Sequence, residues 1–187
     1  KTLGAKKPLI VTDKGVTAAG ITQKILDIAR EAAVEAEVFD ETVPNPTDKN
    51  VADGLKYYND KGCDSIISLG GGSSHDCGKG VGIVATNGGK INDYEGIDQS
   101  TKAMPPFIAI NTTAGTGSEM TRFCIITDTS RKVKMAIVDW RVTPNVAIND
   151  PVLMAGMPPK LTASTGMDAL THAVEAYVST IATPVTD

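Results

Sequence analysis

The sequence predicts an α/β fold with a mostly parallel sheet. Apolar runs of strand length alternate with segments in which apolar residues recur at helical spacing, the pattern of βαβ units. Two of these runs end in loops rich in glycine and hydroxyl side chains. The 187 residues are 41% hydrophobic and 4% aromatic, a composition typical of a globular chain with one substantial core.

In the first half of the chain, strands are expected at residues 9–12, 38–39 and 65–69. Apolar residues at helical spacing follow the first strand: Ile21, Ile25, Ile28, Ala29 and Ala32. Thr47, after a proline-rich turn, is placed to cap a helix whose apolar face carries Val51 and Leu55. The third strand leads into a glycine loop and a helix of small residues that ends near Val84.

In the second half, a strand at 107–110 is followed by the polar loop 111–117. The apolar runs 123–127 and 134–138 are separated by a polar turn at 128–131, which predicts a β-hairpin. A last strand is expected at 146–148, and a long helix at 161–178 follows a proline-punctuated stretch. We therefore place a domain boundary near Asp150.

Charge and cysteine content exclude several classes of protein. The net charge is −4 and no Lys/Arg cluster exceeds two neighbours, so we expect neither nucleic acid nor a membrane as a partner. No apolar run reaches the roughly 18 residues of a membrane-spanning helix. The three cysteines lack C-x-x-C spacing, which indicates no disulfide framework or thiolate zinc site and favours a reducing cytoplasm.

The loop GGGSS at residues 70–74 joins a predicted strand to a predicted helix. Glycines allow close approach of a ligand, and free N–H groups at a helix start favour an anion, so the loop is a candidate phosphate cradle. A tight turn without a ligand is the alternative. G-x-G-x-x-G would need glycine at His75, and a Walker loop would need Ser or Thr at Gly80.

Polar side chains follow two other predicted strands, at the ends where open α/β sheets place their ligands. Thr112, Thr113 and Thr116 are candidate hydroxyl donors or ordinary turn residues. Asp13 can accept hydrogen bonds from a ribose diol and repel a 2′-phosphate, or it can cap a helix. Ser118 lacks the G-x-S-x-G context of a hydrolase nucleophile, so we expect it to cap a helix.

Asp168 and His172 lie four residues apart in the last predicted helix, so their side chains share one face. A carboxylate and an imidazole placed in this way can ligate one metal ion. Taken alone, a surface pair or a buried hydrogen bond is the more common role. His75, beside the glycine loop, is expected to be a helix-start residue.

Read together, the motifs resemble the iron-containing (group III) alcohol dehydrogenases. They are GGGSSHD at 70–76, NTTAGTGSE at 111–119, and MPP at 157–159 followed by TGMDALTHA at 165–173. Residues 44–48, 93–96 and 134–139 are similar to the methanol, ethanol and 1,3-propanediol dehydrogenase branch. The resemblance covers nearly the whole chain.

The resemblance implies a Rossmann-like dinucleotide-binding domain with a mostly parallel sheet at 1–150, an α/β domain that binds NAD. It also implies the beginning of an all-helical metal-binding domain at 151–187. Asp13 would face the adenosine ribose, and Gly71, Gly72 and Ser73 would hold the pyrophosphate. The remaining implied cofactor contacts are Asn45, Asp76, Thr112, Thr113, Thr116 and Lys134. Asp168 and His172 match the first two metal ligands; the other two are histidines beyond the end of this sequence, and we expect both ends to be trimmed.

The implied reaction is hydride transfer between NAD and a short-chain primary alcohol or diol, with a divalent metal polarising the alcohol oxygen. Fe²⁺ is the expected metal, with Zn²⁺ or another ion as alternatives. The expected partners are a small alcohol or aldehyde and, at full length, further copies of the chain. A dehydroquinate-synthase-like lyase and an inactive nucleotide-binding module are the competing hypotheses, and no residue is assigned as a general base.

Overall fold

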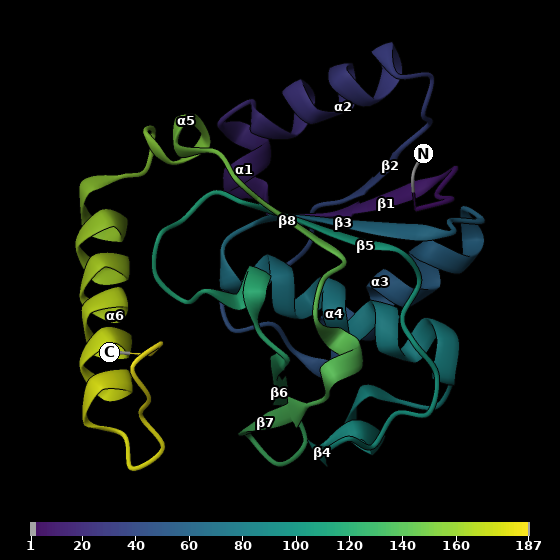
Figure 1. Cartoon of the computed structure of the whole chain (residues 1–187). Helices are drawn as coiled ribbons and strands as arrows, with labels where there is room; N and C mark the ends of the chain where they lie inside the picture. Colours follow the sequence, from purple (N-terminus) through teal and green to yellow (C-terminus); the bar gives the residue numbers. More distant parts are fainter. Residues whose placement is uncertain (1–2, 187) are drawn as a thin grey trace.

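The computed structural model describes residues 3–186 and is built on a five-stranded sheet (Figure 1). The strand order is β2-β1-β3-β5-β8, and every neighbouring pair is parallel. The strands are β1 (Pro8–Val11), β2 (Glu37–Phe39), β3 (Ser65–Gly70), β5 (Phe107–Asn111) and β8 (Val146–Asn149). The predicted α/β fold with a mostly parallel sheet is confirmed.

Helices cover both faces of this sheet (Figure 1). One face carries α1 (Lys14–Ala18) and α2 (Ile21–Glu31); the other carries α3 (Asp48–Asp60) and α4 (Gly72–Asn87). Successive strand residues point to opposite faces, so Ile10 joins the cluster beneath α2, whereas Leu9 and Val11 join the larger core beside α4. Burial on both faces explains why the inner strands β1, β3 and β5 are largely apolar along their length.

A second, three-stranded sheet has the order β4-β7-β6. Its strands are β4 (Gly96–Ile97), β6 (Phe123–Asp128) and β7 (Val133–Val138). β6 and β7 are antiparallel, which confirms the predicted hairpin. Asp128 stabilises the turn, because its Oδ1 accepts hydrogen bonds from the N–H groups of Ser130 (2.8 Å) and Arg131 (3.0 Å).

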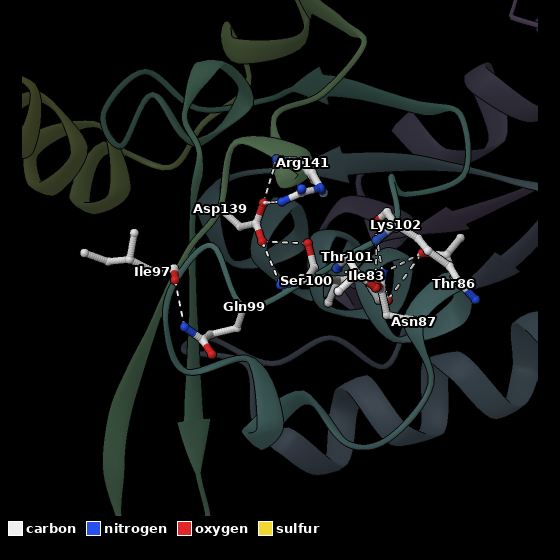
Figure 2. Close-up of polar contacts among 10 residues, drawn as sticks. All are labelled: Ile83, Thr86, Asn87, Ile97, Gln99, Ser100, Thr101, Lys102, Asp139 and Arg141. Carbon is white, nitrogen blue, oxygen red and sulfur yellow. Dashed lines mark hydrogen bonds and ion pairs between the residues drawn. The ribbon is translucent and has the colours of Figure 1, made fainter.

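The connection from α4 to β5 contains only the 3₁₀ turn Ile91–Tyr94 and the two-residue strand β4. Two side chains anchor it (Figure 2). The Asn87 Oδ1 atom accepts hydrogen bonds from the N–H groups of Thr101 (2.9 Å) and Lys102 (2.8 Å). Asp139 accepts two from Ser100, at 3.0 Å from its N–H group and 2.6 Å from its hydroxyl. Side-chain anchors thus replace regular pairing here.

The last helices are α5 (Pro151–Met154) and α6 (Pro159–Val178), and two further 3₁₀ turns are Ser118–Met120 and Trp140–Val142. α6 begins with Pro159 in its first turn, a position that needs no backbone donor. It runs along one side of the molecule, away from the main sheet (Figure 1), and none of its residues is buried. Among residues 3–186, no helix is long and apolar enough to span a bilayer.

Candidate functional site

The glycine loop lies where β3 passes into α4. Gly71 is the N-cap of α4, and no side chain makes a capping hydrogen bond there. The first N–H groups of a helix have no partner within the helix. In the described part of the chain, the α4 N-terminus therefore retains free donors and the positive end of the helix dipole.

The polar loop 111–117 after β5, here called the threonine loop, packs directly against these glycines. A Cβ atom added to Gly71 would lie 2.9 Å from Thr113 Oγ1, and one added to Gly72 would lie 2.8 Å from Thr116 Oγ1. Any larger residue at either glycine would displace a threonine. The two glycines thus allow two hydroxyl groups to reach the N-terminus of α4.

A cleft of about 610 Å³ opens above this contact, a volume within the range of small-molecule sites. It is lined by six of the residues implicated by the sequence: Asp13, Gly71, Gly72, Ser73, Thr113 and Thr116. Asp40 and Glu41, which follow β2, add carboxylates to the same rim. The carboxyl ends of four strands, β1, β2, β3 and β5, therefore converge on one hollow.

A smaller cavity of about 210 Å³ adjoins the cleft and shares Gly72, Ser73 and Thr116 with it. Its lining also includes Asn45, Asp76 and Lys134, together with Thr127 on the hairpin. Lys134 Nζ donates a hydrogen bond to Asn45 Oδ1 (2.7 Å), and the Asn45 N–H group donates to Ser73 Oγ (3.3 Å). These bonds join β7 to the glycine loop.

Thr112 is the one predicted cofactor residue that lines neither cavity. It is buried, and its N–H group donates to the Gly70 carbonyl at 2.9 Å, extending the pairing of β3 and β5. Thr112 thus links the loop that follows β5 to the loop that follows β3. Thr113 and Thr116, by contrast, present their hydroxyls at the cleft.

The Asp13 side chain both caps a helix and lies at the cleft, which the sequence left as alternatives. Its Oδ1 atom caps α1 by accepting from the N–H groups of Gly15 (2.8 Å) and Val16 (3.0 Å). The same side chain lines the cleft, with Oδ2 3.5 Å from Ser74 Oγ. The capping role is confirmed, and it leaves the carboxylate at the cleft edge.

Ser118 does not cap a helix, so that expectation is wrong. The cap position of its 3₁₀ turn is occupied by Gly117, and the Ser118 hydroxyl instead donates to Asp76 Oδ1 at 2.8 Å. Lys79 Nζ lies 3.2 Å from the same hydroxyl. Burial raises the pKa of Asp76 to about 6 despite the nearby ammonium of Lys79.

His75 lies in the first turn of α4, as expected, and is fully buried. Its Nδ1 atom lies 2.7 Å from Ser68 Oγ, within hydrogen-bond distance. Burial lowers the pKa of this imidazole to about 4, so the ring is neutral at pH 7. Its surroundings are those of a core residue beneath the glycine loop.

Asp168 and His172 project from the same face of α6, with Asp168 Oδ1 3.8 Å from His172 Nε2. Both side chains are accessible, at 43% and 57% exposure respectively. This spacing lets one oxygen and one nitrogen reach a common ion. Among residues 3–186, no group of three or more His, Cys, Asp or Glu side chains is arranged as a metal site. The pair could thus offer an ion one oxygen and one nitrogen, and a complete site would need further ligands.

The helix that carries this pair borders the cleft, which the sequence analysis did not predict. Leu161 and Thr165 of α6 are part of the cleft lining. The contact is close, since a Cβ atom on Gly115 would lie 2.9 Å from the Thr165 carbonyl oxygen. No local pattern marks Thr165, because the contact joins segments 50 residues apart.

Comparison with known protein families identifies the architecture. The family described as iron-containing alcohol dehydrogenase matches residues 1–151, and the C-terminal part of the Fe-containing alcohol dehydrogenase family matches 162–187. The chain belongs to the iron-containing alcohol dehydrogenase family. Its strand-end loops and its Asp168–His172 pair are thus features of a member of this family.

Curated relatives of this family member include the 1,3-propanediol dehydrogenase of Citrobacter freundii, 57% identical over 189 residues. The NAD-dependent methanol dehydrogenase of Bacillus methanolicus is 50% identical over 187 residues. In both comparisons 100% of this chain and 49% of the relative are covered. The chain therefore spans about half the length of the relatives it matches.

Solved structures agree with this assignment. A crystal structure of 1,3-propanediol oxidoreductase is similar with a TM-score of 0.97 and 56% identity, over 100% of this chain and 49% of that one. An alcohol dehydrogenase from Oenococcus oeni is similar with a TM-score of 0.96 and 46% identity over the same shares. The arrangement of strands and loops is thus that of the family.

Proposed function

We propose that this chain is the cofactor-binding half of an NAD-dependent alcohol dehydrogenase that acts on a short-chain primary alcohol or diol. The observation that carries the proposal is the meeting of two strand-end loops at an N-terminus of α4 that no side chain caps, beside a 610 Å³ cleft. The names of the relatives, 1,3-propanediol and methanol dehydrogenase, support the substrate class.

In this proposal the chain binds the cofactor by its backbone and hydroxyl groups. The free N–H groups at the start of α4, in Gly72 and Ser73, suit a pyrophosphate, and the hydroxyls of Thr113 and Thr116 add donors. Asp13, at the cleft edge, suits the adenosine ribose diol. The small cavity with Asn45, Asp76 and Lys134 extends this surface toward the hairpin.

Asp168 and His172 are proposed to hold the metal. A mixed oxygen and nitrogen pair fits Fe²⁺, the ion in the family name, and also fits Zn²⁺. When bound, such an ion supplies Lewis-acid polarisation of the alcohol oxygen, and nicotinamide accepts the hydride. The chain's own contribution is to fix the pair on α6, the helix that borders the cofactor cleft.

The test is formation of NADH from methanol, ethanol and 1,3-propanediol by this chain and by a longer protein that extends through the rest of the family's C-terminal domain. Both proteins are treated with chelator and resupplied with Fe²⁺ or Zn²⁺. We expect metal-restored activity in the longer protein, and its loss in the Asp168→Asn variant. Absence of alcohol-dependent NADH from both proteins would overturn the proposal.

We also propose a cytoplasmic location and self-association of the full-length protein. The location is supported by three free, buried cysteines, Cys63, Cys77 and Cys124. Self-association is supported by an apolar row across the small sheet, where Ile97 and Phe123 flank Val138 and are 64% and 47% exposed. Sedimentation of the longer protein and of its Phe123→Ser variant tests the second proposal.

A further inference from the structure

Lys79 lies in the third turn of α4 and is fully buried, at 0% exposure. Lysine is rarely buried to this extent, because removing an ammonium from water is costly unless hydrogen bonds replace the lost solvent. Burial lowers the pKa of Lys79, although the carboxylate of Asp76 acts in the opposite direction. A buried ammonium at this position therefore needs hydrogen-bond acceptors that replace the lost water.

Three backbone carbonyls provide that set. Lys79 Nζ donates to the carbonyl oxygens of Ser118 (2.6 Å), Phe123 (2.8 Å) and Thr121 (3.0 Å). An ammonium has three donors, so these bonds account for its full capacity. All three acceptors lie between the threonine loop and the start of β6, and one side chain thus fixes a six-residue segment, residues 118–123.

The fixed segment continues into the cleft. The Ser118 N–H group donates to Thr116 Oγ1 at 3.2 Å, and this threonine stands against Gly72 at the start of α4. The Ser118 hydroxyl also donates to Asp76, one turn before Lys79 on the same helix. Helix α4 therefore holds the threonine loop by two side chains, Asp76 and Lys79, while its N-terminus faces the cleft.

We propose that Lys79 is a positioning residue for the cofactor: its buried ammonium clamps residues 118–123 and so sets the Thr116 hydroxyl beside the N-terminus of α4. The inference rests on the proposed function, because it takes the cleft to be the NAD site. Lys79 itself does not line the cleft, and it acts on the ligand through the loop. A residue that only filled the core would have no effect on affinity in the folded protein.

The experiment compares the parent chain with Lys79→Met, which keeps the side-chain length and removes the ammonium. NADH affinity is measured by titration well below the unfolding temperature of each variant, which circular dichroism supplies. Amide hydrogen exchange is followed across residues 112–123. The matched control is Lys24→Met, a change of an exposed lysine on α2.

We expect Lys79→Met to weaken NADH binding at least tenfold and to speed amide exchange in residues 112–123 at least tenfold, and Lys24→Met to change neither. In the longer protein, KM for NAD is expected to rise more than kcat falls. Lys79→Gln retains part of the donor set and should give an intermediate affinity, and it serves in place of Lys79→Met if that variant does not fold.

Folded Lys79 variants that bind NADH within twofold of the parent, with unchanged exchange, would overturn the clamp. A parent chain that binds no NADH would instead contradict the proposed function. In that case amide exchange alone tests whether Lys79 holds residues 118–123 in place. Faster exchange confined to residues 112–123 supports this role, and unchanged exchange rejects it.

Discussion

His75 and Asp76 are adjacent residues whose burial gives stability opposite dependences on pH. The pKa of His75 is lowered to about 4, so between pH 4 and 6.5 the unfolded chain binds the extra proton and stability falls as pH falls. The pKa of Asp76 is raised from 3.8 to about 6, so between these pH values the folded chain keeps a proton that the unfolded chain releases, and stability rises as pH falls. The two effects partly cancel in mildly acidic solution.

Replacing His75 should therefore reveal the pH dependence of stability that Asp76 contributes. In His75→Gln the histidine contribution is absent, so we expect the variant to lose less stability than the parent between pH 6.5 and 4.5, by about 2 kcal/mol. Urea unfolding at several pH values measures this difference. An NMR titration in which the His75 ring protonates near pH 6.5 would contradict the explanation.

Asp13 should decide between the two nicotinamide cofactors by charge. Asparagine is as good an N-cap as aspartate, so Asp13→Asn should keep α1 intact while removing the carboxylate that repels a 2′-phosphate. We expect NADPH binding to tighten by roughly tenfold, about 1.4 kcal/mol, with a smaller change for NADH. Titration of both cofactors measures the ratio.

The control for this prediction is Asp27→Asn, which removes an exposed carboxylate from α2 at a site outside the cleft. It changes the net charge by the same amount and should leave the NADPH to NADH ratio unchanged. Equal affinity of the parent chain for the two cofactors would show that Asp13 does not discriminate.

At the scale of the structural elements, the connection from α4 to β5 is held by two side chains, Asn87 and Asp139. Asn87 donates to the carbonyls of Ile83 and Lys102, both at 3.0 Å, and accepts from two N–H groups of the loop (Figure 2). We expect Asn87→Ala to destabilise the fold by roughly 2–3 kcal/mol, since it removes four hydrogen bonds to backbone groups, each worth about 0.5–1.5 kcal/mol. Asn59→Ala, an exposed change near the end of α3, should cost far less in the same denaturant measurement.

The elements that the sequence predicted well are those with long periodic patterns. The strands of the main sheet and the helices α2, α3, α4 and α6 were within a few residues of their observed bounds, because burial imposes a regular apolar spacing. The short elements α1, α5 and β4 were not predicted, since four or five residues at most carry no period. Their ends are set instead by individual side chains such as Asp13 and Asp150.

The site was predictable where it lies at strand ends and not where it depends on contacts between distant segments. Strand-end placement brought Asp13, the glycine loop, Thr113 and Thr116 to one cleft. The role of Ser118 was mistaken because its partners, Asp76 and Lys79, lie about 40 residues earlier in the chain. A lysine between two glycines gives no sign in the sequence that it is buried.

For the whole molecule, α6 is the part least supported by its surroundings. Its apolar side chains are more than half exposed at several positions: Met167, Leu170, Val174, Tyr177 and Val178. Exposed apolar surface of this extent is typical of a packing interface. The relatives are about twice as long as this chain, so their additional residues are available to cover such a helix.

Metal affinity should therefore depend on the length of the protein. With Asp168 and His172 as its two proposed ligands, this chain should bind Zn²⁺ weakly, because stable sites use three or more protein ligands. The longer protein should bind at least about a hundredfold more tightly and lose that gain in Asp168→Asn and His172→Gln. Competition with a chromophoric chelator measures both affinities. Tight binding by this chain that survives both substitutions would place the ion elsewhere, and the pair on α6 would then be an ordinary surface pair.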